Sequence, residues 1–529
     1  MRSAAPGMDY EVIVIGGGVN GLVCATLLAL AKRRVLLVEA RDRMGGMCAT
    51  GEITPGYRVS TIAHLIGPLD AEVTKALRLN KFGLQLSAKQ ISAVALSAQG
   101  QHIVLGEDLR NTSQSLMSHS SADAKAWAPF ETKLRRAAQQ VHAWVKSPPG
   151  GAFDVSTKSS FFSGRSAARA SVALDPEWAS IADGSIADLL DGEFSTPLLK
   201  GALAFDAVMG NALSPSMLGT AFLAVMRRAL DGANSGGLVH PQGGVGGFVS
   251  ALVKAAEAAG VKFKLNARVD HFLFDSGRLA GVEFTNSEAV YAPQIVSSLS
   301  PQTTLLGFGA ERDLPIGLKR RLASARISGC VSKVNLALSS QPSFKGLDKK
   351  YLKDRLIICP SVDHLERSFA AYEQGRFSSE VSMEITVPSS HDATLVKSGQ
   401  HVLSATVFYV PKNLASGSWE TAKAELVSIV GARLREYAPE LPDQVIGADV
   451  YTPADIDELS GGAGGHWHGG DLSFDQLGIL RPAEGVSRSA TPVPGLFLCG
   501  AGTHPCGGVT GINGRIAAEA VLAHLTVAP

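Results

Sequence analysis

Redox-active cysteine pairs are absent from this chain of 529 residues. Its six cysteines are scattered, and no two of them have CxxC or CxxxxC spacing. A disulfide reductase needs such a pair, together with a second nucleotide-binding fold for NAD(P)H. The glycine-rich segment 243–247 does not supply that fold, because Val249 occupies the last glycine position of the GxGxxG pattern. The sequence therefore argues against a disulfide reductase.

Strong charge and long apolar runs are absent as well. The formal net charge is +1 and charged residues make up 18% of the chain, so no basic surface indicates a nucleic-acid partner. No run approaches the ~18 apolar residues of a membrane span. Residues 1–8 lack the charged and apolar regions of a signal peptide, and scattered cysteines are typical of a reducing compartment. We expect a cytoplasmic protein. Its low charge leaves a peripheral membrane contact open, and its oligomeric state has no signal in the sequence.

The strongest positive signal lies near the N-terminus. The apolar segment 9–15 predicts a buried strand, which leads through the glycine-rich turn 16–21 into an apolar helix. Gly16 permits the tight turn, Gly18 lets the backbone approach a pyrophosphate, and Gly21 lets helix and strand pack closely. The free N–H groups and the positive dipole end of the helix suit phosphates. The segment therefore predicts a dinucleotide site.

A second predicted strand, 34–38, ends on Glu39, which lies 18 residues after the last glycine of the turn. A carboxylate there accepts hydrogen bonds from a ribose diol and disfavours a 2′-phosphate, which argues against NADP. Gly45 and Gly46 follow, and such a pair lets the backbone pass close to a long cofactor such as FAD. Arg41 fits either a place beside the adenosine or pyrophosphate or a solvated surface position.

A second strand–turn–helix unit lies at the C-terminus. Segment 494–500 predicts a short apolar strand ending at Gly500, with Gly502 and Gly511 in the turn and a helix from Ile512. The N-terminus of that helix suits the flavin pyrimidine or the ribityl chain, where negative charge develops on reduction. Units at both ends of the chain predict FAD as the cofactor.

With both ends considered, the chain resembles the phytoene desaturase-like branch of the FAD amine-oxidase superfamily. The stretches that carry the resemblance are the N-terminal unit through Gly46, segments 241–247 and 468–482, and the run 500–514. Cys506 departs from the pattern, because such proteins tend to have another glycine there. The resemblance implies an α/β fold in which a Rossmann-type (glutathione-reductase-like) FAD-binding domain is interleaved with a mixed α+β substrate and cap domain.

The two domains are expected to alternate along the chain without a single linker. We assign residues 9–75, 235–310 and 456–529 to the FAD-binding domain, and residues 76–234, mostly helical, and 311–455 to the substrate and cap domain.

Further strands are expected inside these parts. Residues 331–338, 381–387 and 401–410 predict strands that floor the substrate cavity, and residues 290–297 predict one more strand of the FAD-binding domain. In similar FAD proteins a segment like the one at Val269 offers backbone groups to the adenine. The complete set of expected cofactor residues is Gly16, Gly18, Asn20, Gly21, Glu39, Ala40, Arg41, Gly45, Gly46, Met47, Val269, Gly500, Gly502, Gly511 and Ile512.

Histidines are the candidates for acid–base catalysis, because the pKa of histidine lies near neutrality. In the superfamily the loop with His466 and His468 runs beside the flavin ring, so each is either a flavin-facing acid or base or a residue that shapes the loop. His504 follows the C-terminal turn and His64 follows the glycine pair; both have the same two alternatives. The pair 466/468 lacks further ligands nearby, so no metal site is expected. Cys506 is either a covalent attachment point for flavin or a small residue in place of glycine.

The loop after these histidines has its own candidates. Asp475, Gln476 and Arg481 are expected either to brace the active-site loop by hydrogen bonds or to form a surface turn.

These observations predict an FAD-dependent oxidoreductase of the phytoene dehydrogenase-like type. It would desaturate, dehydrogenate or isomerise a small apolar substrate such as an isoprenoid or polyene, with hydride passing to flavin N5. Reoxidation would use oxygen, a quinone or another acceptor, because no NAD(P)H fold is evident. An amine or amino-acid oxidase is the second hypothesis, weakened because segment 502–508 has no tryptophan or tyrosine for an aromatic cage. A flavin-bound regulatory or interaction protein without turnover is the third.

Overall fold

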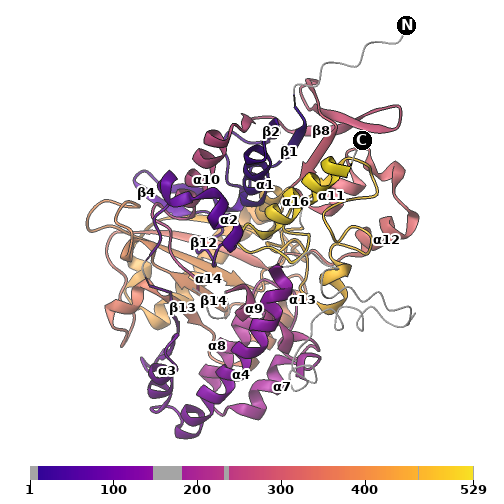
Figure 1. Cartoon of the computed structure of the whole chain (residues 1–529). Coiled ribbons are helices and arrows are strands. Elements are labelled where there is room, and N and C mark those ends of the chain that lie inside the picture. Colours follow the sequence, from indigo (N-terminus) through magenta and orange to yellow (C-terminus); the bar gives the residue numbers. More distant parts are fainter. Residues whose placement is uncertain (1–9, 88, 147–180, 232–236, 463, 528–529) are drawn as a thin grey trace.

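A parallel sheet forms the framework of the nucleotide-binding part. The computed structural model describes residues 10–87, 89–146, 181–231, 237–462 and 464–527 (Figure 1). The sheet has five strands in the order β17-β11-β1-β2-β7, all paired in parallel. Its central strands are apolar runs buried on both faces, as parallel sheets require. The strands are β1 (Val12–Ile15), β2 (Val35–Val38), β7 (Lys262–Lys264), β11 (Gln294–Ser297) and β17 (Leu496–Leu498).

Three helices pack around this sheet: α1 (Val19–Leu30), α10 (Val245–Ala259) and α16 (Ile512–Val527) (Figure 1). Helix α1 contacts both α10 and α16. A Cβ on Gly514 would lie 2.3 Å from the carbonyl oxygen of Asn20, so the crossing of α1 and α16 depends on glycine. The first and last parts of the chain are thereby joined at the start of α1.

The predicted strand 290–297 is wrong, because the structure divides it in two. Strand β10 (Ala289–Tyr291) pairs antiparallel with β9 (Arg278–Phe284), which pairs with β8 (Val269–Asp275), whereas β11 joins the parallel sheet. Pro293 lies between them and has no N–H group to donate to a ladder, so the chain leaves one sheet and enters the other there.

A second sheet of seven strands has the order β16-β12-β15-β14-β13-β5-β6, with one parallel pair, β13–β5. Three of its strands match the predicted ones. The other four were not expected, and β5 and β6 lie in the part expected to be mostly helical. The strands are β5 (Ala93–Ala95), β6 (Ile103–Leu105), β12 (Val331–Leu338), β13 (Arg355–Ile358), β14 (Met383–Thr386), β15 (His401–Phe408) and β16 (Val445–Tyr451).

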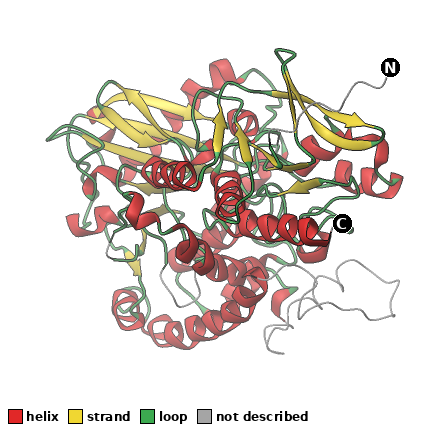
Figure 2. Cartoon of the chain, turned by 45° about the horizontal axis from the view of Figure 1, so that its top comes forward, coloured by secondary structure: helices red, strands yellow, loops and turns green. Residues whose placement is uncertain are grey.

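Helices cover one side of this second sheet and form a cap, seen as the lower helical layer of Figures 1 and 2. Helix α9 contacts α4 and α8, and α8 contacts α13. Phe205 of α8 packs edge-on against Phe408 of β15, with ring centroids 5.7 Å apart. Residues 147–180 of the expected cap lie outside the described residues. The cap helices are α4 (Ser121–Lys146), α7 (Ile186–Glu193), α8 (Pro197–Val208), α9 (Thr220–Leu230) and α13 (Val362–Glu373).

Further helices and strands complete the two parts. Across the described ranges, no helix has the length and apolar character needed to cross a membrane. The remaining elements are β3 (Thr50–Thr54), β4 (Tyr57–Ser60), α2 (Ala71–Leu77), α3 (Leu109–Leu116), α11 (Pro301–Leu306), α12 (Ile316–Ser324), α14 (Trp419–Tyr437) and α15 (Pro453–Ser460).

Candidate active site

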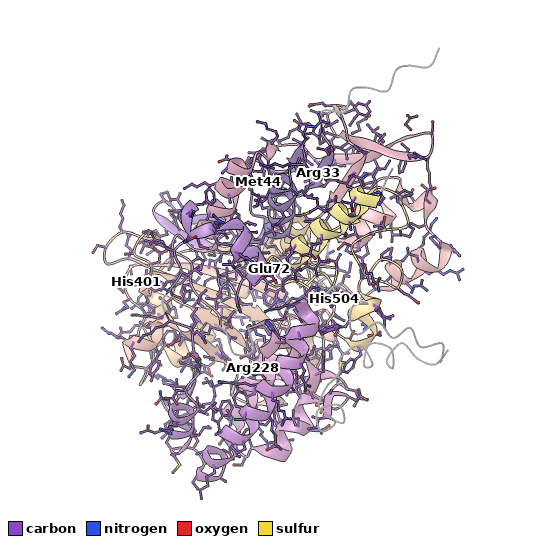
Figure 3. All side chains as sticks on the ribbon, viewed as in Figure 1. Arg33, Met44, Glu72, Arg228, His401 and His504 are labelled. Carbon is purple, nitrogen blue, oxygen red and sulfur yellow. The ribbon has the colours of Figure 1, made fainter. Side chains whose placement is uncertain are left out.

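One cavity of about 770 Å³ connects the nucleotide-binding part with the cap. Its wall combines the β1–α1 turn with residues of α8 and α9 and with one residue of β14. Figure 3 labels Met44 near the first of these walls and Arg228 on α9 near the other. The expected cofactor residues that line the cavity are Gly16, Gly18, Asn20, Glu39, Ala40, Arg41, Gly45, Gly46, Met47, Val269 and Gly502.

The glycines of the β1–α1 turn have the geometry that their spacing predicts. Gly16 has a φ of 94°, a left-handed conformation that favours glycine. A Cβ on Gly21 would lie 2.0 Å from the carbonyl oxygen of Gly16, so α1 approaches the turn too closely for any side chain. A Cβ on Gly18 would meet nothing within 4 Å. Gly18 therefore borders open space in the cavity wall, where a pyrophosphate can approach the first turn of α1.

Glu39 is fixed at the end of β2 by backbone donors. Its Oε2 accepts a hydrogen bond from the Gly17 N–H at 2.7 Å, and its Oε1 accepts one from the Arg41 N–H at 3.1 Å. The carboxylate lines the cavity beside the glycine turn, and Arg41 lines it as well rather than lying on the open surface. This arrangement presents acceptor oxygens to a ribose diol.

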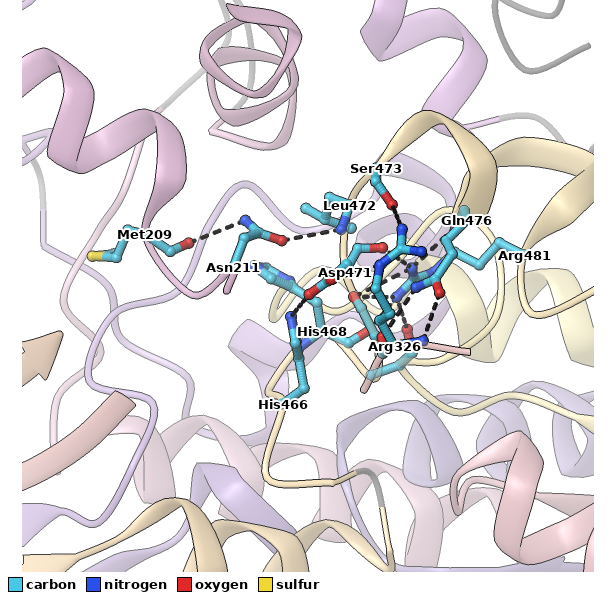
Figure 4. Close-up of polar contacts among 12 residues, drawn as sticks. Met209, Asn211, Arg326, His466, His468, Asp471, Leu472, Ser473, Gln476 and Arg481 are labelled. Carbon is cyan, nitrogen blue, oxygen red and sulfur yellow. Dashed lines mark hydrogen bonds and ion pairs between the residues drawn. The ribbon is translucent and has the colours of Figure 1, made fainter. Parts of the chain in front are cut away.

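The loop with His466 and His468 forms part of the same wall (Figure 4). Nδ1 of His466 accepts a hydrogen bond from the His468 N–H at 3.1 Å, so its proton is on Nε2, which faces Oδ1 of Asp471 at 3.4 Å. Nδ1 of His468 lies 2.9 Å from the Gly507 carbonyl and must donate to it. Nε2 of His468 is therefore an acceptor. Burial, with His466 nearby, holds the pKa of His468 well below its usual value, so the ring is neutral.

Arg481 holds this loop in place. Its side chain is buried, with 2% of the residue exposed, and donates to the carbonyl groups of His468, Asp471, Ala501 and Thr503 (Figure 4). The structure confirms the expected bracing role and excludes a surface turn at this residue. Because these acceptors belong to both the histidine loop and the C-terminal turn, one guanidinium group fixes two walls of the cavity.

The other two residues expected to brace this loop, Asp475 and Gln476, bind a neighbouring segment of the chain. Asp475 pairs with Arg326 at 2.7 Å, and Gln476 exchanges hydrogen bonds with the Arg326 backbone. They therefore tie the loop to the segment between α12 and β12.

A buried polar network lies behind His64, and the sequence patterns did not predict most of it. Nε2 of His64 lies 2.8 Å from Oε1 of Glu384, and Nδ1 lies 2.8 Å from Nζ of Lys333. Arg355 binds Glu384 and Asp206 together, with Nη2 of Arg355 2.5 Å from Oδ1 of Asp206. His64, Glu384 and Asp206 line the cavity. Both ring nitrogens of His64 are engaged, so it positions its neighbours rather than facing the cavity as a free acid or base.

Burial sets the charge states of this network. It lowers the pKa of Lys333 to about 7, and burial together with Lys333 lowers the pKa of His64 to about 4. Burial, the largest single influence, would raise the pKa of Glu384, but the Arg355 guanidinium and the hydrogen bond from His64 together outweigh it and hold that pKa well below its usual value. The ring of His64 is therefore neutral, with Nε2–H donating to the Glu384 carboxylate and Nδ1 accepting from Lys333. In the sequence, a sign of this network was Lys333, a charged residue within the mostly apolar strand β12.

A family model described as flavin containing amine oxidoreductase matches residues 20–522. The chain belongs to this family. It is therefore an FAD-dependent oxidoreductase, and an enzyme, which leaves the hypothesis of a protein without turnover unsupported.

Relatives in this oxidoreductase family match over nearly the whole chain. The rat protein called pyridine nucleotide-disulfide oxidoreductase domain-containing protein 2 is 30% identical, over 98% of this chain and 94% of its own length. One of the subunits of limonene dehydrogenase from Castellaniella defragrans is 26% identical, over 97% and 94%. A lycopene-forming phytoene desaturase of Pantoea ananas is 23% identical, over 96% and 98%.

Solved structures agree with the family fold. Putrescine oxidase superposes with a TM-score of 0.66 at 17% identity, covering 99% of this chain and all of that one. At that identity the likeness shows the fold, a Rossmann-like FAD-binding domain with a mixed substrate domain. The six cysteines of this flavin oxidoreductase are all buried free thiols.

The residues present fit FAD, the cofactor of this family. The open space at Gly18 and the Glu39 carboxylate suit the ADP half. At the other end, residues 507–510 line the cavity just before α16 begins, although the sequence motif pointed only to the flanking glycines. Bound FAD would supply an acceptor for a hydride. Gly21, Gly500, Gly511 and Ile512 lie behind this wall and shape it without lining the cavity.

His504 does not line the cavity, so of its two alternatives the structure favours a role in shaping the turn over contact with the flavin edge. Its ring packs edge-on against Trp144 of α4, with centroids 4.8 Å apart, and Nε2 lies 3.3 Å from the Trp144 carbonyl oxygen. Asn513 of α16 instead donates to carbonyls of the C-terminal turn, including that of His504. Cys506 is also outside the cavity lining, and burial raises its pKa to about 11, which suits a small packed residue better than a nucleophile.

Proposed function

We propose that this flavoenzyme removes a hydride from an apolar substrate of the isoprenoid class, as a dehydrogenase or desaturase. The observation that carries the proposal is the continuity of the cavity. It runs without interruption from the dinucleotide turn at Gly18 to the helices of the cap. A substrate bound under the cap would therefore share one continuous cavity with the reactive end of the cofactor.

The cap side of this cavity has mainly aliphatic walls. Such a surface binds hydrocarbon chains by excluding water, with about 25 cal/mol gained for each Å² buried. The apolar residues that line it include Ile62, Leu65, Ala207, Met209, Leu223, Leu230, Leu238 and Leu472.

Two relatives support this substrate class through their names. The limonene dehydrogenase and the phytoene desaturases are named for limonene and phytoene, which are isoprenoid hydrocarbons. The amine oxidases among the solved structures share the fold at identities too low to support a substrate.

The side chains around the reacting centre bind, orient and exclude water. His468 offers a neutral acceptor nitrogen in the cavity wall, suited to accept a hydrogen bond that orients the substrate. Arg481 holds that loop in place, and the Lys333–His64–Glu384 network fixes the part of the wall that His64 and Glu384 form. FAD held in this cavity would supply the hydride acceptor.

The first test is the visible spectrum of the purified protein, before and after acid precipitation. Flavin that moves to the supernatant shows bound, non-covalent FAD; flavin that stays in the pellet shows a covalent link. The holoprotein is then mixed anaerobically with limonene or phytoene and, in parallel, with putrescine or cyclohexylamine.

Bleaching by the isoprenoids alone supports the proposal. Bleaching by the amines alone overturns it in favour of the amine-oxidase hypothesis. The variant Gly18→Val is the control without flavin, and it must show no bleaching with any donor.

A further inference from the structure

Arg227 presents unused hydrogen-bond donors to the cavity. It lies in the last turn of α9, lines the cavity, and keeps 18% of its side chain exposed. Its Nε donates to Oδ2 of Asp231 at 3.0 Å. Over the described ranges of the chain, no group accepts a hydrogen bond from its Nη1 or Nη2 atoms. The outer edge of the guanidinium fork is therefore available to a ligand.

Its neighbour in sequence shows that this placement is specific. Arg228 turns the other way and pairs with Glu131 of α4 at 3.3 Å, and it does not line the same cavity. Glu131 in turn also binds Arg135. Of two adjacent arginines, one closes a structural ion pair and the other faces the substrate space.

Two carboxylates of the cavity wall are already engaged by cationic or histidine side chains. Both oxygens of Asp206 face Arg355, and the two oxygens of Glu384 are taken by Arg355 and His64. The cap end of the cavity therefore offers the free Nη donors of Arg227, whereas Asp206 and Glu384 are paired and Oδ2 of Asp231 is held by Arg227 itself. Such a surface favours an oxygen that accepts hydrogen bonds over an amine that donates them.

Arg227 is also close enough to act on the site electrostatically. Burial is the largest influence on the pKa of His468, and Arg227 is among the charges that lower it further. Burial raises the pKa of Asp206, but the charges of Arg355 and then of Arg227 lower it, so that the pKa lies below its usual value. The guanidinium thus lies within electrostatic range of the histidine loop, and aliphatic residues such as Leu223 share the wall with it.

We propose that Arg227 binds a hydrogen-bond-accepting oxygen of the substrate, a hydroxyl, carbonyl or carboxylate oxygen, at the cap end of the cavity. This inference rests on the proposed function and narrows it. The substrate is an oxygenated apolar molecule rather than a pure hydrocarbon. The planar fork of arginine suits this role, because it directs two N–H groups at one oxygen or one carboxylate.

The test compares ligands with the same carbon skeleton. Geraniol, geranic acid, geranylamine and the hydrocarbon myrcene are titrated into the oxidised holoprotein. Their Kd values are measured from the shift of the flavin band and, independently, from the shift in melting temperature. A hydrogen bond from a charged donor predicts that geraniol or geranic acid binds about tenfold or more tightly than myrcene, with geranylamine below both. Which of the two binds more tightly distinguishes a hydroxyl from a carboxylate.

Variants assign the preference to one side chain. Arg227→Met keeps a similar volume without donors and is expected to remove the preference for oxygen. Asp231→Asn releases the Nε pair but leaves the fork in place, so the preference is expected to remain. If Arg227→Met loses its FAD or its fold, Arg227→Lys replaces it, and a preference reduced severalfold is expected because the point charge lacks the fork.

The outcomes separate this inference from the proposed function. Equal binding of myrcene and geraniol to the wild-type protein overturns the role of Arg227, even where isoprenoids bleach the flavin. A preference that persists in Arg227→Met overturns it as well. Conversely, an Arg227-dependent preference for oxygen without bleaching by any isoprenoid supports the subsite and counts against the proposed reaction.

Discussion

Nζ of Lys333 donates a hydrogen bond to Nδ1 of His64 at 2.8 Å, and only 2% of Lys333 is exposed. The same Nζ atom donates to Oγ1 of Thr406 at 2.9 Å. A buried ammonium group without a directly bonded carboxylate loses its hydration and regains little of that cost. The nearest compensation comes through His64, whose other nitrogen faces Glu384. Lys333 is therefore held in a state that titrates near neutral pH.

The stability of the protein is expected to depend on pH through Lys333. Its pKa is about 7 in the folded protein and 10.5 as the ordinary value, so the unfolded chain binds more protons between these pH values. The free energy of unfolding therefore increases as pH rises from about 7 to 10.5. Below about pH 7 the full cost of burying the charged lysine is present. Lys333→Met removes the penalty. The melting temperature of Lys333→Met minus that of wild type is expected to be largest near pH 7 and to decrease toward pH 10.

The exposed Lys349 provides the matched control. Lys349→Met is expected to follow the wild-type pH dependence throughout. A pH-independent difference between Lys333→Met and wild type would show that Lys333 does not change protonation in this range.

The two motif glycines are expected to fail in different ways. Gly18→Val adds a side chain to open space at the cavity wall, so the fold is expected to remain while FAD binding is lost. Gly21→Val places a Cβ about 2.0 Å from a backbone carbonyl oxygen, so loss of the fold itself is expected. Circular dichroism and flavin content distinguish the two results. Stoichiometric flavin in Gly18→Val would contradict the placement of the pyrophosphate.

Local sequence patterns predicted the elements whose form depends on nearby residues. The turn around Gly16 was found because its glycines have the spacing of a dinucleotide-binding turn. Strand β12 was found because most of its residues are apolar. The segment 290–297 was predicted as one strand, although it contains parts of two, because the run around Pro293 is otherwise largely apolar.

Contacts between distant residues were beyond reach of those patterns. Lys333 and His64 are 269 positions apart, and the partner of His64 on β14 lies farther along the chain still. The sequence marked His64 as a candidate but gave no means to see that both of its nitrogens are engaged. The position of His504 after a glycine turn left both a role beside the flavin and a structural role open, and the fold, which directs its ring toward Trp144 of the cap, favours the structural one.

Glu39 is expected to control FAD affinity more than folding. A carboxylate that accepts hydrogen bonds from ribose hydroxyls contributes about 1.5–3 kcal/mol for each bond, so Glu39→Ala is expected to raise the Kd for FAD by about tenfold to a hundredfold. The measurement is a titration of the flavin-free protein, followed by fluorescence quenching. Glu39→Gln keeps the shape of the side chain but loses its charge, so its Kd for FAD is expected to lie between those of wild type and Glu39→Ala. An unchanged Kd in Glu39→Ala would remove the carboxylate from the ribose site.

Substitution of His468 and His504 tests which histidine belongs to the active site. His468 lines the cavity with a neutral acceptor nitrogen, so His468→Ala is expected to slow flavin reduction at least about tenfold, with little change in melting temperature. His504 packs on Trp144 outside the cavity lining, so His504→Ala is expected to cost about 1–3 kcal/mol of stability while the flavin spectrum and the reduction rate stay near wild type. Rapid-mixing reduction with the best bleaching substrate and thermal melts measure both effects. The reverse pattern, with slow reduction in His504→Ala and normal reduction in His468→Ala, would show that the histidine of the C-terminal turn, and not that of the 466–468 loop, acts on the reaction, because the rate would then follow the residue outside the cavity lining.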